Sequence, residues 1–311
     1  MRILVTGGAG FIGSHVAQAY ADAGHEVLVL DNLSSGKEEN IPRQARFVFG
    51  EIQSETAAEA IKTFRPEVIN HHAAQINVRK SVEDPAFDAN ANIIGSLNLL
   101  EAARKNGARK IIFASSGGAG YGEQEYFPAD ENHPIRPVSP YGVAKVSVEH
   151  YLHYYKVQYG LEYTSLRYSN VYGPRQDPFG EAGVVAIFCT RLLRGQTTII
   201  NGDGKQTRDY VYVGDVVRAN IEALTRGDGL KINIGTAMET DVNDLFRKLR
   251  QLSESAQEEI HGPAMPGEQR RSVIDNRLAF DELGWYPNML LDDGLALTLA
   301  YFREKVQQLN N

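Results

Sequence analysis

Tyr141 and Lys145 are the residues whose types and spacing most directly suggest chemistry. They stand in the run 139–145, Ser-Pro-Tyr-Gly-Val-Ala-Lys, where Ser139 suits a helix N-cap and Pro140 the first helical turn. Residues four apart on a helix share a face, so an ammonium would lie beside a phenol. That charge favours the phenolate and lowers a pKa that is about 10 in an unperturbed tyrosine. The pair therefore predicts a tyrosine that acts as a general base.

The spacing alone is weak, because Tyr301 and Lys305 match it as well and are interpreted as part of an amphipathic surface helix. Tyr141 differs in its context, since it follows an apolar run, 110–114, that ends in Ser115 and Ser116. A hydroxyl at the carboxyl end of such a strand can donate to a substrate oxygen. Ser116 is therefore the predicted third catalytic residue, and the alternative is a turn residue before the following glycines.

A second pattern is the glycine run at Gly7, Gly10 and Gly13. A predicted strand, 2–6, precedes it and a helix with an apolar face follows, which is typical of a turn that cradles a pyrophosphate. A second strand, 26–30, ends at Asp31, whose carboxylate can accept bonds from ribose hydroxyls and would repel a 2′-phosphate. The pattern predicts NAD rather than NADP, and the alternative for Asp31 is a turn or cap residue.

Strands and helices alternate over the first 170 residues of the sequence. Such alternation predicts an α/β fold with a doubly wound parallel sheet, the Rossmann architecture. We expect residues 1–172 to form the dinucleotide-binding domain, with 206–235 returning to it. A smaller C-terminal α/β substrate lobe is expected from 173–205 and 236–311. The predicted strands are 2–6, 26–30, 46–49, 67–70, 109–114 and 162–167, and the predicted helices are 11–22, 54–64, 84–106 and 140–159.

Composition narrows the function classes. The chain has 311 residues, 42% of them hydrophobic, and a net charge of −7 with scattered basic residues, which argues against nucleic acid as a partner. The eight histidines show no metal-ligand spacing, so no metal is expected. The single cysteine, Cys189, is expected to be a packed thiol in a reducing compartment. With no signal peptide or membrane span recognised, a cytoplasmic location is expected.

Taken in order, several motifs together resemble the extended short-chain dehydrogenase/reductase family: TGGAGFIG, Asp31, Ala73-Ala74, Ser115-Ser116, the Tyr141 and Lys145 pair, and LRYSNVYGP at 166–174. The chain is similar over essentially its whole length to the UDP-glucose 4-epimerases and related nucleotide-sugar epimerases. The resemblance implies an isomerase that holds NAD tightly and transiently oxidises C4 of a UDP-sugar, while Tyr141 takes the proton from O4. It also implies a homodimer formed through helices 84–106 and 140–159.

The resemblance also implies a set of site residues. Cofactor contacts are expected from Gly7, Gly10, Phe11, Ile12, Gly13, Asp31, Asn32, Ser35, Gly36, Glu51, Ile52, Ala73, Ala74, Gln75, Asn92, Ser115, Tyr141, Lys145 and Tyr168. Substrate contacts are expected from Ser116, Asn170, Val184, Arg208, Arg270 and Ser272. Arg208 has an independent rationale, because a guanidinium pairs well with a diphosphate. Its alternative is a surface ion pair with Asp209 or another acid.

Three positions depart from the family pattern. Gly117 stands where relatives usually carry Ser or Thr, which moves the expected hydroxyl to Ser116. Met265 stands where relatives generally have an arginine for the diphosphate, so Arg270 or Arg271 would have to compensate. Glu51 replaces the usual aspartate near the adenine.

The small Ser272 stands where relatives limit the room beside the sugar, so we predict that N-acetylated UDP-hexosamines are also accepted.

A dehydratase or decarboxylase is disfavoured, because 117–119 reads Gly-Gly-Ala and offers no acid. Two alternatives stay open: another NAD-dependent nucleotide-sugar reductase or epimerase of this family, and a non-catalytic NAD-binding regulator on the same fold.

Overall fold

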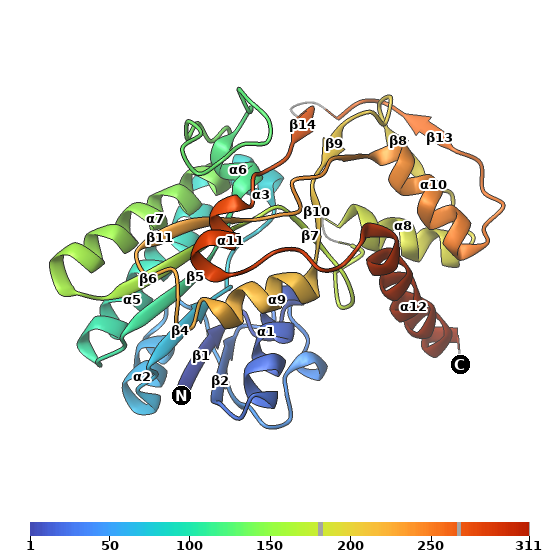
Figure 1. Ribbon diagram of the computed structural model, residues 1–311. Coiled ribbons are helices and arrows are strands. Elements are labelled where there is room, and N and C mark those ends of the chain that lie inside the picture. Colours follow the sequence, from blue (N-terminus) through green and yellow to red (C-terminus); the bar gives the residue numbers. More distant parts are fainter. Residues whose placement is uncertain (180–182, 266–268, 311) are drawn as a thin grey trace.

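The fold is built on a parallel sheet of seven strands (Figure 1), in a computed structural model that describes residues 1–179, 183–265 and 269–310. The strand order is β11-β6-β5-β4-β1-β2-β3. The chain winds outward in opposite directions from β1 and β4, which leaves a crevice at the carboxyl ends of those two strands. The strands are β1 Arg2–Thr6, β2 Glu26–Asp31, β3 Arg46–Phe49, β4 Val68–His71, β5 Lys110–Ser116, β6 Glu162–Tyr168 and β11 Leu230–Ile234.

Helices cover both faces of the sheet, as the doubly wound prediction requires (Figure 1). Successive residues of a strand point to opposite faces. Accordingly Ile3 and Val5 lie in one core cluster and Leu4 lies in the other. The first face is covered by α1 Phe11–Asp22, α9 Val213–Glu222 and α11 Arg277–Leu283, and the second by α2 Glu55–Phe64, α5 Gly95–Lys105 and α7 Pro140–Tyr159.

The helix predicted over 84–106 is divided into three segments: α4 Pro85–Ala89, a π-helical turn η2 Asn90–Ile94, and α5. A further helix, α3 Val78–Glu83, precedes them and was not predicted. Pro85 lacks an N–H and cannot continue α3, so the chain restarts at Asp84, whose side chain accepts from the Phe87 N–H at 2.9 Å. The break lets α3 and α4 pack on the first turns of α7.

A smaller lobe packs three helices around its own core, which includes Cys189. Figure 1 shows α8, α10 and α12 on the side of the molecule away from α5 and α7. These helices pack on short strands that form small separate sheets. The helices are α8 Val184–Leu193, α10 Val242–Ser253 and α12 Leu291–Asn310, and the strands are β7 Asn170–Tyr172, β8 Ile199–Asn201, β10 Tyr210–Tyr212 and β13 Ile260–Gly262.

The division between the two parts differs in detail from the predicted boundaries. Within the predicted return segment 206–235, β11 is the outermost strand of the main sheet and α9 packs beside α1, whereas β9 Thr207–Arg208 and β10 pair outside that sheet. The assignment of all of 236–311 to the lobe is wrong, because Ala279, Leu283 and Trp285 belong to the core cluster of the main sheet. The reason is a buried apolar face on α11, which covers β11 after the chain leaves the lobe.

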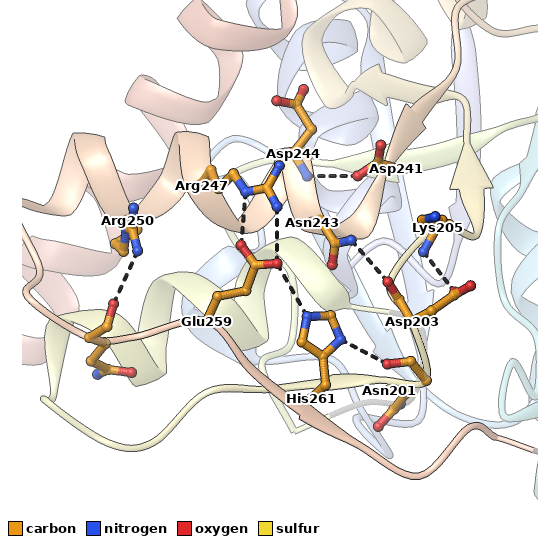
Figure 2. Close-up of polar contacts among 12 residues, drawn as sticks. Asn201, Asp203, Lys205, Asp241, Asn243, Asp244, Arg247, Arg250, Glu259 and His261 are labelled. Carbon is orange, nitrogen blue, oxygen red and sulfur yellow. Dashed lines mark hydrogen bonds and ion pairs between the residues drawn. The ribbon is translucent and has the colours of Figure 1, made fainter.

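Strand β13 is tied to α10 by a line of charged groups (Figure 2). Arg247 contacts both oxygens of Glu259, at 2.8 and 3.1 Å. His261 lies 3.2 Å from Glu259 through Nε2 and 2.8 Å from the Gly202 carbonyl oxygen through Nδ1. Both partners are acceptors, so both ring nitrogens donate, and the Gly202 carbonyl and Glu259 raise the pKa of His261.

Candidate functional site

The glycine run forms a tight turn at the mouth of the crevice. Gly7 has φ +68°, and a Cβ on it would lie 2.6 Å from the backbone nitrogen of Ala73. A Cβ on Gly13 would lie 2.2 Å from the Gly7 carbonyl oxygen. Helix α1 begins directly after Gly10, which has no side chain to cap the first N–H groups. The turn therefore presents bare backbone and a positive helix end, which suit a pyrophosphate.

Asp31 is buried at the tip of β2 and is tied to this turn. Its Oδ2 accepts from the Ala9 N–H at 2.9 Å and its Oδ1 from the Leu33 N–H at 2.8 Å. Asp31 therefore does hold a turn. A carboxylate has about four acceptor sites, so two bonds leave capacity for ribose hydroxyls. Gly36 lies against Asp31, since a Cβ on it would approach Oδ1 to 3.0 Å.

The loop after β4 lies beside the glycine turn and is shaped by Asn92. The Asn92 amide accepts from the Gln75 N–H at 2.9 Å and donates to the Gln75 carbonyl at 3.0 Å. Thr6 at the end of β1 accepts from the Ala73 N–H at 3.2 Å. Asn92 thus acts on this side of the crevice by fixing the backbone of the loop.

Tyr141 and Lys145 lie together at the carboxyl end of β5. Ser139 caps α7 as predicted, accepting from the Gly142 N–H at 3.1 Å. The Lys145 Nζ lies 5.7 Å from the centre of the Tyr141 ring and donates to the Ala114 carbonyl at 2.8 Å. The bond to Ala114 anchors the pair to the crevice edge of the sheet.

The expected direction of the Tyr141 pKa is wrong for the protein by itself. Burial and the nearby Asp88 carboxylate raise the pKa of Tyr141. Burial also lowers the pKa of Lys145 to about 8, against the opposing effect of Asp88 and Glu149. Removing the phenol from water outweighs the pull of one ammonium, so the phenolate needs further positive charge in the site.

Predicted substrate residues from distant parts of the chain meet beside Ser116. Ser116 accepts from the Ala119 N–H at 3.3 Å and so caps α6, Gly117–Tyr121, which leaves its O–H able to donate. A Cβ on Gly118 would lie 3.3 Å from the Ser272 Oγ. Ser272 pairs in register with Arg208, in a small sheet formed by β9 Thr207–Arg208, β12 Thr240–Asp241 and β14 Arg271–Ser272.

Two other predicted substrate residues lie on elements that border this sheet. The Asn170 N–H donates to the Asp209 carbonyl at 2.9 Å, directly after Arg208 in the chain. Val184 is the first residue of α8 and is half-buried. Asn170 therefore lies beside the chain segment that carries Arg208, which in turn pairs with Ser272.

The arginines expected to replace the missing guanidinium at Met265 are engaged elsewhere. Arg270 contacts both oxygens of Asp203, at 2.7 and 2.9 Å, and Arg271 contacts both oxygens of Glu239. The guanidinium that lies beside Met265 is that of Arg79, 3.9 Å from the sulfur. Residues 266–268, which follow Met265, lie outside the described residues.

Other predicted cofactor residues make contacts within the protein. Ser115 is buried and bonds to the Glu149 carboxylate, while the Tyr168 hydroxyl accepts from Asn220 at 2.9 Å. Glu51 is exposed and accepts from Gln53 at 2.9 Å. Ile52 is buried near Gly95, whose added Cβ would approach it to 2.6 Å. Asn32 accepts from the Ser34 N–H, and Ser35 lies in the same loop after β2. Ala74 lies in the loop after β4.

Sequence reasoning missed the buried groups behind the pair. Glu149 forms a buried ion pair with Arg167, with contacts at 2.6 and 2.9 Å. Asp88 is fully buried and lies close enough to affect both Tyr141 and Lys145. The helical spacing was a usable signal, because Glu149 follows Lys145 by four residues and Asn92 follows Asp88 by four.

Within residues 1–179, 183–265 and 269–310, no cluster of three or more His, Cys, Asp or Glu side chains could hold a metal ion. In the same described part of the chain, no helix has the length and apolar character needed to cross a membrane.

Comparisons with known proteins match this geometry. Residues 3–235 match the model of the NAD dependent epimerase/dehydratase family. The chain is 50% identical to a putative UDP-glucose 4-epimerase of Methanocaldococcus jannaschii, covering 97% of this chain and 98% of that protein. A UDP-glucose 4-epimerase of Thermotoga maritima, solved with UDP-glucose, is 52% identical over 98% of this chain and 100% of that chain, with a TM-score of 0.96. A UDP-glucose 4-epimerase of Thermus thermophilus, solved with NAD, is 45% identical over 97% and 99% of the two chains, with a TM-score of 0.93.

Proposed function

This chain belongs to the NAD dependent epimerase/dehydratase family, and we propose that it interconverts UDP-glucose and UDP-galactose by transient oxidation at C4. The observation that carries the proposal is the bond from Lys145 to the Ala114 carbonyl. It fixes Lys145 to β5, the strand that carries Ser116, and the centre of the Tyr141 ring lies 5.7 Å from the Lys145 Nζ. The full-length similarity to UDP-glucose 4-epimerases supports the same activity.

NAD fits the residues at the glycine turn. The bare backbone at Gly7 and Gly13 suits its pyrophosphate, and the remaining acceptor capacity of Asp31 suits a ribose. When bound, NAD supplies an electron acceptor for C4 and a positive charge near Tyr141. That charge acts in the direction that the buried phenol requires.

The chain's own residues manage the proton and the orientation of the sugar. Tyr141 removes the proton from the sugar O4 as C4 is oxidised, and returns it when C4 is reduced. The Ser116 hydroxyl donates to the same oxygen and steadies the transfer. Arg208 pairs with the diphosphate, while Asn92 on η2 fixes the loop at Gln75 on the cofactor side of the crevice.

The small side chain of Ser272 is the reason for extending the proposal to N-acetylated sugars. Ser272 is buried on β14, and a Cβ on Gly118 would lie 3.3 Å from its Oγ, so a larger side chain at either position would crowd the other. We expect UDP-N-acetylglucosamine and UDP-N-acetylgalactosamine to be turned over as well. Turnover of UDP-glucose and UDP-galactose without turnover of these two sugars would contradict this extension.

We further propose a homodimer through α7 and the helical segment 84–106. Val143 and Tyr154 on α7 and Phe87 and Ile94 beside it are exposed, which is typical of an interface. Light scattering of the purified protein tests this, and a monomer at micromolar concentration would contradict it. A cytoplasmic site of action fits the free thiol of Cys189.

The test is turnover of UDP-galactose by purified protein without added NAD, followed by separation of the C4 epimers. Product without added cofactor supports an epimerase that retains NAD. Turnover that requires added reductant identifies a reductase instead. Tyr141→Phe should abolish turnover and keep NAD bound, whereas Tyr301→Phe, the matched control in the second Tyr-x-x-x-Lys pair, should leave turnover unchanged. A non-catalytic regulator would show no turnover in any variant.

A further inference from the structure

A buried carboxylate lies behind the catalytic pair and is used by none of the steps above. Asp88, on α4, is fully buried. Its Oδ1 accepts from the amide groups of Gln75 and Asn92, at 3.0 Å each. Its Oδ2 is buried and has no hydrogen-bond partner among the described residues. Burial raises the pKa of the Asp88 carboxyl, because the charged form is costly away from water, and the Gln75 and Asn92 amides and a nearby positive charge oppose this rise.

The packing of α3 and α4 on α7 supplies that charge. Asp88 and Ala144 line the same hollow, of about 500 Å³, between α4 and the start of α7. Ser81 on α3 accepts from the Tyr141 N–H at 3.3 Å, which fixes the first turn of α7 against these helices. The cation that acts on Asp88 is Lys145, the residue that follows Ala144.

Among the other titratable groups that the structure describes around this pair, the buried ones carry no positive charge that lacks its own counter-ion. His71 and His72, at the end of β4, have pKa values lowered by burial and then by Lys145, so both are neutral. On α7, Glu149 is already paired with Arg167. The charged side chains of α3, at Arg79, Lys80 and Glu83, are exposed to water.

We propose that Asp88 is a positioning residue for the reaction, which balances the charge of Lys145 and at the same time holds the side chains of Gln75, in the loop after β4, and of Asn92, on η2. This inference goes beyond the proposed function and rests on it only for the effect on turnover. Asp88 stabilises both the protonated Lys145 and the protonated Tyr141. It therefore sets how readily the site gives up a proton.

Asp88→Asn removes the negative charge of the side chain and keeps its size and shape. Asparagine keeps an oxygen for the Gln75 and Asn92 amides, and its NH₂ replaces an oxygen that makes no bond. Loss of the negative charge should lower the pKa of Lys145 from about 8 by roughly 0.5 to 1 pH unit. The matched control is Asp84→Asn, which keeps the exposed N-cap of α4 and should leave that pKa unchanged.

The first measurement is an NMR titration of ¹³Cε-labelled lysine in the purified protein, with the Lys145 signal identified by its loss in Lys145→Arg. The second is the pH dependence of UDP-galactose turnover, whose acidic limb should move to lower pH in Asp88→Asn by a similar amount. A Lys145 midpoint that is unchanged or higher in Asp88→Asn overturns the proposal. If that variant does not fold, Asp88→Ser removes the same charge and is held to the same outcomes. Absence of turnover in the unmodified protein would overturn the proposed function alone, because the lysine titration does not depend on activity.

Discussion

The buried ion pair between Glu149 and Arg167 offers the sharpest test of how the site is held together. Both side chains are almost fully buried, at 1% and 4% exposure, and Arg167 makes two bonds to the carboxylate. Burial would raise the pKa of Glu149, but Arg167, Ser115 and Ser165 reverse this and lower it. Glu149 is therefore ionised at neutral pH and cannot lose its charge without leaving Arg167 unpaired.

Glu149→Gln keeps the size of the side chain and removes its charge. An unpaired buried guanidinium should lower the free energy of unfolding by about 3 to 5 kcal/mol. That is a large part of the roughly 5 to 15 kcal/mol that stabilises a typical domain. At about 2 to 4 °C per kcal/mol for a domain of this size, the melting temperature should fall by on the order of 10 °C.

The assay is urea unfolding followed by circular dichroism, with a thermal melt in parallel. The matched control is Glu59→Gln on α2, where an exposed pair with Lys62 at 2.9 Å should contribute less than about 0.5 kcal/mol. Adding Arg167→Met to Glu149→Gln should restore part of the stability, because no unpaired charge remains. If Glu149→Gln lowers the free energy of unfolding by less than about 1 kcal/mol, or if the double variant is less stable than Glu149→Gln alone, the reasoning is refuted.

Three further outcomes are expected. Gly7→Ala should lower both the NAD content and the melting temperature, because Gly7 has a positive φ and the added Cβ would lie 2.6 Å from the Ala73 backbone nitrogen. The control is Gly24→Ala: Gly24 also has a positive φ, but no atom lies within 4 Å of its added Cβ, so this variant should keep its NAD. Ser272→Tyr should reduce turnover of UDP-N-acetylgalactosamine more than that of UDP-galactose, measured as the ratio of the two kcat/KM values. The raised pKa of His261 stabilises the fold below its unfolded pKa of about 6.5, and this stability is lost as pH rises through the folded pKa. The melting temperature of the unmodified protein should therefore fall as pH rises through the folded pKa of His261, and that of His261→Gln should fall less. An equal dependence of melting temperature on pH in the two proteins would contradict this.

The sequence predicted the main sheet well because its signals are local. Buried parallel strands appear as short apolar runs and the helices between them as periodic ones, so the bounds of α1 and α7 agree with the predicted 11–22 and 140–159. The family model and the relatives confirm the predicted family and cofactor. The short helix α3 before Pro85 was missed, because six residues are too few to show a helical apolar period.

The sequence alone therefore determined the order of the strands and helices and the identity of the residues that can take part in catalysis or cofactor binding. Tyr141, Lys145 and the glycine run were recognisable because each depends on neighbours within a few positions. Only the tertiary structure decided that Ser272 lies beside Gly118, and that Asp88 raises the pKa of Tyr141. Desolvation and charge depend on which distant segments pack together, and no local pattern records that.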